Sequence, residues 1–211
     1  MTTFADLVTS TYTVTKRPDL VAETTLALKR AITKEHAAMD YPRDLASIAV
    51  PLTQPVPNTY RYTLSLATLS LYPSARKITR IIEIDNPVEP AAATYLGNQG
   101  LIEFKEKAHD NLFDSYHMEA YNYFYRFGSN LNLVAQRQVN NVAIQYYFLP
   151  DLSNTASYSD WMADMYDYAI YTHAAAEIFR IIGKSEEYKM QLAMVQENRL
   201  DIIKNEIGRI G

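Results

Sequence analysis

The stretch Ile182-Gly183-Lys184-Ser185 decides how the last part of the chain, from Ser159 to Gly208, is arranged. Gly183 suits the left-handed backbone position just past a helix end, and Ser185 can cap a second helix whose first turn is acidic. These signals predict helices at about Asp160–Ile182 and Ser185–Ile207. The connection is so short that the two helices must lie antiparallel.

Apolar residues recur at steps of three and four along both predicted helices, which is typical of amphipathic helices. They are Trp161, Met165, Tyr168, Ala169, Thr172, Ala176 and Phe179 in the first, and Tyr188, Leu192, Val195, Leu200, Ile203 and Ile207 in the second. A hairpin alone cannot bury these stripes, so we expect it to pack on an earlier part of the chain.

Two helical patterns at the N-terminus supply that part. Phe4, Leu7 and Val8 begin a short helix of about Thr3–Tyr12. A longer helix of about Pro18–Met39 follows, and Tyr41-Pro42 ends it because the residue before proline avoids the helical region.

The middle of the chain, from Leu45 to about Leu152, is rich in strand signals. Prolines at 51, 55 and 57 exclude a continuous helix. Alternating or aromatic runs predict strands at Tyr60–Leu66, Ile78–Ile84, Tyr121–Phe127, Leu131–Val134 and Val142–Phe148. The stretch Leu101–Asn111 fits a strand or a helix equally well.

This order of elements predicts an α+β fold. We expect a helical bundle, made of the long N-terminal helix and the C-terminal antiparallel helix hairpin, from residues 1–44 and 159–211. An antiparallel β-rich subdomain, residues 45–158, is inserted in it.

Composition excludes several classes of protein. The net charge of −4 over 211 residues argues against non-specific nucleic-acid binding. The chain has no cysteine, so disulfides and thiolate metal sites are excluded. The N-terminus lacks a basic region followed by an apolar core, so we expect no signal peptide. No apolar run reaches the roughly 18 residues that span a bilayer.

Signatures of catalysis are missing. The sequence contains no glycine-rich phosphate loop, no Gly-x-Ser-x-Gly elbow and no thiol nucleophile. His36 and His173 are expected to be surface or hydrogen-bonded helix residues. Asp160, Asp164 and Asp167 form a weak candidate for a divalent cation and are more typical of a solvated helix face. We therefore expect no catalytic residue, no cofactor and no metal.

Tyrosine is unusually frequent, with 17 residues against 6 glycines and 1 tryptophan. Its apolar ring and polar tip suit surfaces that are buried against a partner. High β-propensity on an exposed sheet face accounts for it equally well.

Three groups of residues resemble the head-to-tail adaptor proteins of tailed bacteriophages. The first comprises Phe4-Ala5-Asp6-Leu7-Val8, Arg17-Pro18-Asp19-Leu20-Val21 and the run from His36 to Leu45. The second is Ile144-Gln145-Tyr146-Tyr147-Phe148-Leu149-Pro150. The third runs from Trp161 through Tyr168-Ala169-Ile170 and Ala174-Ala175-Ala176 to the sequence from Ile178 to Lys184, followed by an amphipathic helix with Asn198 and Asn205-Glu206.

The resemblance implies a structural virion protein without catalysis. Such adaptors form a homo-oligomeric ring, usually of twelve subunits, that joins the portal to the tail tube or nozzle. The protein would be made in the bacterial host cytoplasm and act at the head–tail junction. DNA would pass through the ring during genome ejection without specific binding, and no membrane would be involved.

The resemblance also suggests contact residues. C-terminal segments of adaptors often reach the portal, which makes Lys204, Asn205, Glu206, Arg209 and Ile210 the candidate portal contacts.

The β-rich part supplies candidate contacts with neighbouring subunits or the tail: Tyr121, Tyr123, Tyr125, Tyr146 and Tyr147. The first three of these share one strand face.

Two alternatives remain open. One is another tail-completion or baseplate protein. The other is a hydrolase or small-molecule-binding domain built on Glu103, His109, Asp110 and His117.

Overall fold

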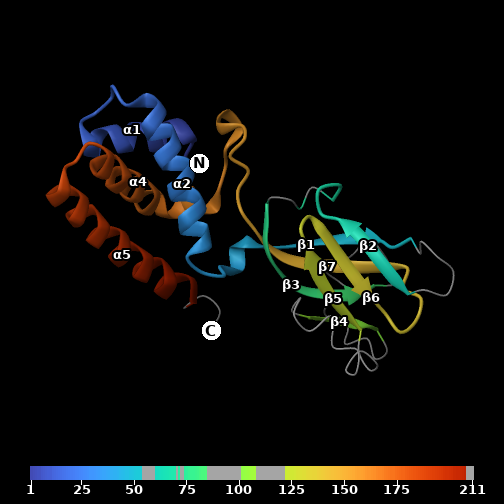
Figure 1. Cartoon of the computed structure of the whole chain (residues 1–211). Helices are drawn as coiled ribbons and strands as arrows, with labels where there is room; N and C mark the ends of the chain where they lie inside the picture. Colours follow the sequence, from blue (N-terminus) through green and yellow to red (C-terminus); the bar gives the residue numbers. More distant parts are fainter. Residues whose placement is uncertain (54–59, 70, 72–73, 85–100, 108–121, 208–211) are drawn as a thin grey trace. The chain divides into compact units, whose positions relative to one another are not determined.

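A computed structural model describes residues 1–53, 60–69, 71, 74–84, 101–107 and 122–207 (Figure 1). The chain divides into two units, each with its own core. The helical unit comprises Met1–Asp44 and Leu149–Gly211, and the β unit comprises Leu45–Phe148.

The helical unit is built from segments at both ends of the chain. Its α-helices are α1 (Phe4–Thr15), α2 (Val21–Ala37), α4 (Trp161–Ile181) and α5 (Ser185–Ile207), and its short 3₁₀ turns are η1 (Pro42–Asp44) and η4 (Thr155–Ser157). A capping box begins α1: the Asp6 N–H donates to Thr3 Oγ1 at 3.2 Å, and the Thr3 N–H donates to the Asp6 carboxylate at 2.8 Å. Two orphan amides are satisfied in this way.

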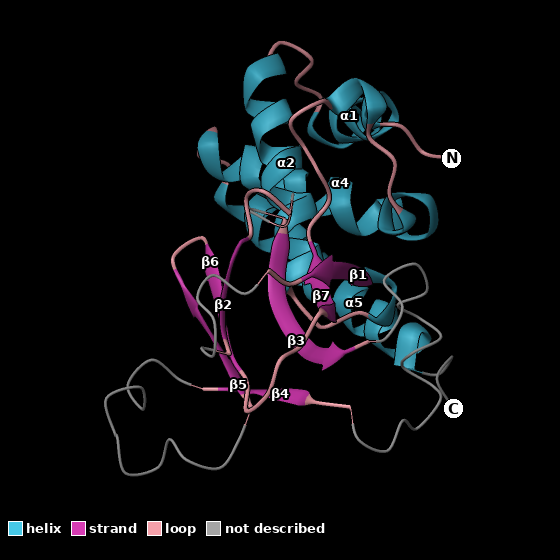
Figure 2. Cartoon of the chain, turned by 90° about the vertical axis from the view of Figure 1, so that its right-hand side faces the viewer, coloured by secondary structure: helices cyan, strands magenta, loops and turns pink. Residues whose placement is uncertain are grey.

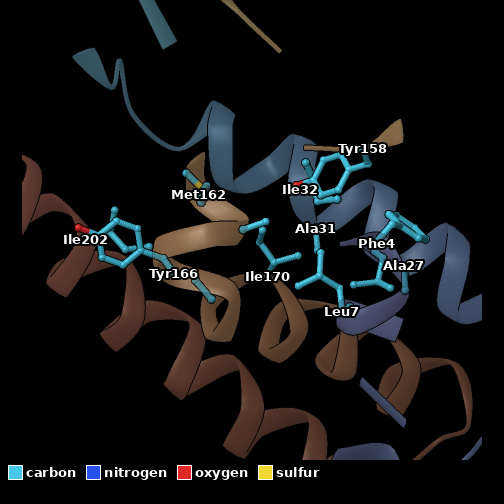
Figure 3. Close-up of a cluster of buried hydrophobic side chains, with 14 of the residues drawn as sticks. Phe4, Leu7, Ala27, Ala31, Ile32, Tyr158, Met162, Tyr166, Ile170 and Ile202 are labelled. Carbon is cyan, nitrogen blue, oxygen red and sulfur yellow. The ribbon is translucent and has the colours of Figure 1, made fainter. Parts of the chain in front are cut away.

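Helix α4 forms the centre of the helical core. It is buried on nearly every side, and α1, α2 and α5 all pack against it. Side chains from these helices meet in one cluster, in which Ile170 of α4 lies near Leu7 of α1 and Ala31 of α2 (Figure 3). The fully buried run Ala174–Ala176 keeps the α4 surface thin, so that neighbouring helices can approach closely.

A Schellman motif ends α4, as the sequence predicts. Gly183 has φ of +75°, the Gly183 N–H donates to the Arg180 carbonyl at 3.3 Å, and the Lys184 N–H donates to the Phe179 carbonyl at 2.9 Å. These bonds satisfy carbonyls at the helix end. The chain then turns directly into α5, which runs beside α4 (Figure 1).

The strands described in the β unit form one seven-stranded sheet (Figure 2). Its strands are β1 (Leu45–Pro51), β2 (Arg61–Ser65), β3 (Ala75–Glu83), β4 (Glu103–Glu106), β5 (Tyr123–Phe127), β6 (Asn130–Val134) and β7 (Asn141–Phe148). The order across the sheet is β1-β7-β3-β4-β5-β6-β2.

The sheet curls around its own core. Val50 of edge strand β1 and Tyr62 of edge strand β2 belong to the same buried cluster, which also includes Phe124, Leu133 and Ile144. The buried cluster therefore extends across the whole sheet, from one edge strand to the other. The fully buried Tyr62 hydroxyl accepts a bond from the Val139 N–H at 3.0 Å, so its polar tip is satisfied.

The predicted fold class, a helical bundle with an inserted antiparallel β subdomain, is wrong. Among the described residues, strand-unit side chains form buried clusters of 15 and 3 residues, and the helical cluster has 16. The strands therefore carry at least as much core as the helices and form a unit in their own right. The sheet is also not antiparallel throughout, because β4 and β5 pair in parallel.

Individual elements agree better with the sequence analysis. The hairpin, both N-terminal helices and the five predicted strands are present, with ends shifted by a few residues. Strand β1 was not predicted, and the described part of Leu101–Asn111 contains strand β4. The segment after Phe148 belongs to the helical unit, since Tyr158 lies in the helical core.

Gly183 offers a direct test of the hairpin turn. A Cβ added at Gly183 meets no atom within 4 Å, so Gly183→Ala changes only backbone strain. We expect it to reduce the free energy of unfolding by about 1 kcal/mol, because alanine disfavours the left-handed region. Gly183→Asn should cost less. Urea unfolding followed by the fluorescence of Trp161, the one tryptophan, measures both; equal stability of the alanine variant and the wild type would contradict this account.

Candidate functional site

The helical unit buries an unusual number of charged side chains. Glu35, His36, Asp44, Asp160, Glu177 and Glu206 are each less than a tenth exposed. Buried charges are costly unless they are paired and hydrogen-bonded. Each of these residues has such partners. Five of them belong to three centres, and the sixth, Glu177, is paired separately with Lys34 of α2.

The first centre surrounds His36 of α2. Its Nδ1 lies 2.9 Å from Asp44 Oδ2 in η1, and its Nε2 lies 2.7 Å from Asp160 Oδ2 just before α4. Both carboxylates have a second donor: Trp161 Nε1–H bonds Asp44 at 2.7 Å, and the Tyr158 hydroxyl bonds Asp160 at 3.1 Å. The His36 centre is these five side chains.

This geometry holds His36 as an imidazolium. Burial alone would lower the pKa of His36, but the hydrogen bonds to Asp160 and Asp44, with their negative charges, outweigh it and raise the pKa from 6.5 to about 9. A ring that meets a carboxylate at both nitrogens must carry both protons. Burial also raises the pKa of Tyr158, which stays a neutral donor to Asp160.

The second centre surrounds Glu35, the residue before His36. Its carboxylate accepts a bidentate pair from Arg199 of α5, at 2.8 and 2.9 Å, and a very short bond from His173 Nδ1 of α4. Burial would raise the pKa of Glu35, but the bonds from His173 and Arg199 dominate and lower it. One carboxylate thus joins α2, α4 and α5.

The third centre is Glu206 near the end of α5. Its carboxylate accepts a bond from Arg43 Nε at 3.1 Å and from the Tyr166 hydroxyl at 3.0 Å. Tyr166 occupies the kink of α4, with φ of −140° and ψ of 38°. The last turns of α5 are therefore fastened to η1 and to α4 by polar contacts.

The candidate portal contacts differ in their exposure to solvent. Lys204 and Asn205 are exposed on α5. Glu206 is 3% exposed and its carboxylate is already bonded inside the helical unit, so it does not present a free contact group. Arg209 and Ile210 lie outside the described residues.

The candidate tyrosines also differ in exposure. Tyr123 is buried and Tyr125 half-buried, and their rings stack at 6.4 Å on one face of β5, as alternation predicts. Tyr146 is half-buried against the β core, and Tyr147 lies beneath Arg76, whose Cζ is 5.4 Å from the ring centre. Tyr121 lies outside the described residues.

A hollow in the β unit surrounds the stacked pair. It has a volume of about 260 Å³, and we call it the tyrosine hollow. Register puts the outward side chains of three adjacent strands side by side there: Arg61 and Thr63 of β2, Asn132 and Val134 of β6, and Tyr123 and Tyr125 of β5. Thr63 donates to the Asn132 side chain at 2.9 Å, and Lys107 Nζ lies 4.5 Å from the Tyr123 ring centre.

The residues proposed for a hydrolase are not brought together in the described structure. Glu103 lies on β4 and is paired with Arg80 at 2.7 Å, whereas His109, Asp110 and His117 lie outside the described residues. Within the residues that the structure describes, no three acidic or histidine side chains form a metal cluster, and Asp160 is occupied by His36.

Sequence reasoning missed the His36 centre. His36 and Asp160 are separated by 124 positions, and nothing in the local pattern links them. The one available signal was the position of His36 on the buried side of α2, four residues after the fully buried Ile32. A polar residue on such a face needs a partner from elsewhere in the chain.

Comparison with protein-family models and with curated proteins found no match for this chain. None of the helices described here has the length and apolarity needed to cross a membrane.

The His36 centre makes the stability of the helical unit pH-dependent. Because the folded pKa of about 9 exceeds the ordinary 6.5, the native state binds the proton more tightly. The stabilisation, on the order of 3 kcal/mol, is complete below pH 6.5 and is lost as the pH rises towards 9. We expect the urea midpoint reported by Trp161 to fall over that interval. The neutral triple variant His36→Gln, Asp44→Asn, Asp160→Asn should show a much flatter dependence; an unchanged wild-type midpoint would refute the imidazolium assignment.

Removing one carboxylate should also be costly. Asp160→Asn keeps the side-chain shape but leaves the buried imidazolium with one carboxylate, so we expect a loss of about 2–4 kcal/mol at pH 6. Asp164→Asn, one turn further along α4 and exposed, is the matched control and should change stability by less than about 1 kcal/mol. Similar losses in both variants would show that the His36 centre contributes no more than a surface carboxylate.

Proposed function

We propose that this chain is a structural virion protein, a head-to-tail adaptor that forms a ring between the portal and the tail of a bacteriophage. The proposal begins from the resemblance carried by the run His36–Leu45 and by the pattern that starts at Trp161. In this role the protein acts by binding other protein subunits.

One observation supports the proposal most directly. Residues of two separate stretches that carry the resemblance meet in the His36 centre: His36 and Asp44 come from the first, and Trp161 from the third. They are therefore parts of a single buried arrangement. A resemblance carried by two distant stretches supports a common fold more strongly when side chains of those stretches contact each other.

The structure also offers surfaces for the contacts that an adaptor needs. Lys204 and Asn205 present a polar patch on α5. The tyrosine hollow presents the half-buried ring of Tyr125 and the exposed Arg61, residue types that are enriched at protein interfaces. In this proposal the first surface meets the portal, and the second meets a neighbouring subunit or the tail.

The decisive experiment is the native mass of the purified protein, alone and mixed with portal rings from the same phage. We expect a monomer that adds to the portal as a fixed number of copies. A protein that does not bind the portal rings and stays monomeric would contradict the adaptor role and favour a hydrolase or small-molecule-binding domain.

A pair of variants tests which surface meets the portal. Lys204 and Lys189 are both exposed lysines of α5, each paired with an acid three residues earlier. If the C-terminal end of α5 docks on the portal, Lys204→Glu should weaken capture several-fold through charge reversal at the interface, and Lys189→Glu should not. Equal capture of both variants would exclude this end of α5 from the portal contact.

A further inference from the structure

A pocket of about 240 Å³ lies among α2, α4 and α5 in the helical unit. It is lined by Lys34 of α2, by His173, Ala176, Glu177 and Arg180 of α4, and by Tyr188 and Leu192 of α5. We call it the His173 pocket. It is separate from the His36 centre and from the surfaces assigned above.

His173 presents one ring nitrogen to this pocket. The residue is 8% exposed, and its Nδ1 carries a hydrogen because it bonds the Glu35 carboxylate, which only accepts. Its Nε2 has no hydrogen-bond partner among the residues that the structure describes. Glu35 is in turn fixed by the bidentate bond from Arg199, so the orientation of the His173 ring is set from behind.

The rim of the pocket has an excess of positive charge. The Glu177 carboxylate is surrounded by Lys34 Nζ at 2.5 Å, Arg180 Nη2 at 3.3 Å and Arg30 Nη1 at 3.8 Å. Among the residues that the structure describes, no second carboxylate pairs with these three cations, so two positive charges remain in excess. Burial would raise the pKa of Glu177, but the bond and charge of Lys34, followed by the charges of Arg180 and His173, lower it, so this carboxylate stays ionised.

The positive charge of the pocket is opposite in sign to the net charge of the helical unit. The helical unit contains 12 lysines and arginines against 16 aspartates and glutamates. A positively charged pocket in an acidic unit discriminates between ligands: the unit as a whole repels a polyanion, whereas one anionic group can enter. The pocket volume also suits one side chain better than a polymer.

We propose that the His173 pocket binds the carboxylate of an acidic side chain from a partner protein. Arg180 and Lys34 supply charged N–H donors at the rim. Ala176 and Leu192 give the pocket apolar walls that strengthen these bonds. The inference concerns the ligand of this pocket and does not depend on the adaptor role.

The test uses the full chain and two matched probes, N-acetylglutamate α-amide and its neutral counterpart N-acetylglutamine α-amide. Each is titrated at pH 6 and constant ionic strength while the imidazole ¹H and ¹⁵N signals are followed by NMR. We expect a saturable shift of the His173 signals with the glutamate probe alone. The signals of His36, sealed in its own centre, should stay fixed and serve as an internal control.

Two arginine variants locate the site. Arg180→Gln should weaken binding about tenfold, as expected for loss of a charged hydrogen bond. Arg17→Gln is the matched control, because Arg17 is also a surface arginine paired with an acid and lies outside the pocket. Unchanged Trp161 emission verifies that both variants are folded. Equal affinity in the two variants would overturn the assignment of the pocket.

The remaining outcomes are also decisive. A shift that stays linear with concentration, or one that the glutamine probe reproduces, would show that the pocket is no carboxylate site. Inorganic phosphate is titrated in parallel. Tighter binding of phosphate than of the glutamate probe would replace the carboxylate with a tetrahedral oxyanion as the ligand and refute the proposal as stated.

Discussion

The helical unit depends on one imidazolium held between two carboxylates. His36, Asp44 and Asp160 are fully or almost fully buried, so none of them is compensated by water. Removing His36 would leave two carboxylates without their cation in a medium of low dielectric constant, and removing either carboxylate would leave one imidazolium N–H without its acceptor. Trp161 and Tyr158 complete the arrangement by donating to the carboxylates, which lets one positive charge support two negative ones.

The place of these residues in the chain explains why the centre matters for the fold. Asp44 is the last residue before the β unit, and Asp160 follows soon after the chain returns from it. A unit assembled from both ends of a chain needs a contact that joins those ends. Here His36 supplies that contact. The hydrophobic core around Ile170 joins the same helices by apolar contacts, and the His36 centre adds hydrogen bonds among α2, η1 and the start of α4.

Local signals in the sequence predicted what is locally determined. The 3.6-residue periodicity of Trp161–Ile181 and Ser185–Ile207, and the glycine between them, were sufficient for the hairpin. Strand β1 was not predicted, because its partner, β7, lies about a hundred residues away and its own sequence ends among prolines. The His36 centre was missed for the same reason, since His36 and Asp160 lie 124 positions apart. Each is decided by residues far apart in the chain, which periodicity does not report. Of the proposed contact residues, alternation correctly placed Tyr123 and Tyr125 on one face, but it could not show that Glu206 turns inward.

Charge counted from sequence is a poor guide to the surface of this protein. The net charge of −4 includes Glu35, Asp44, Asp160 and Glu206, which are buried and bonded to cations or hydrogen-bond donors inside the helical unit. Helix α5 contributes few buried apolar residues, Val195 and Ile202 among those described, and is held by Arg199 and Glu206 through the second and third centres. Some acidic residues of the helical unit therefore form the hydrogen bonds and ion pairs that hold α5 against the other helices. The charge that a partner meets is set by the remaining side chains, which is why a cationic pocket around His173 can exist in a unit with an excess of acids.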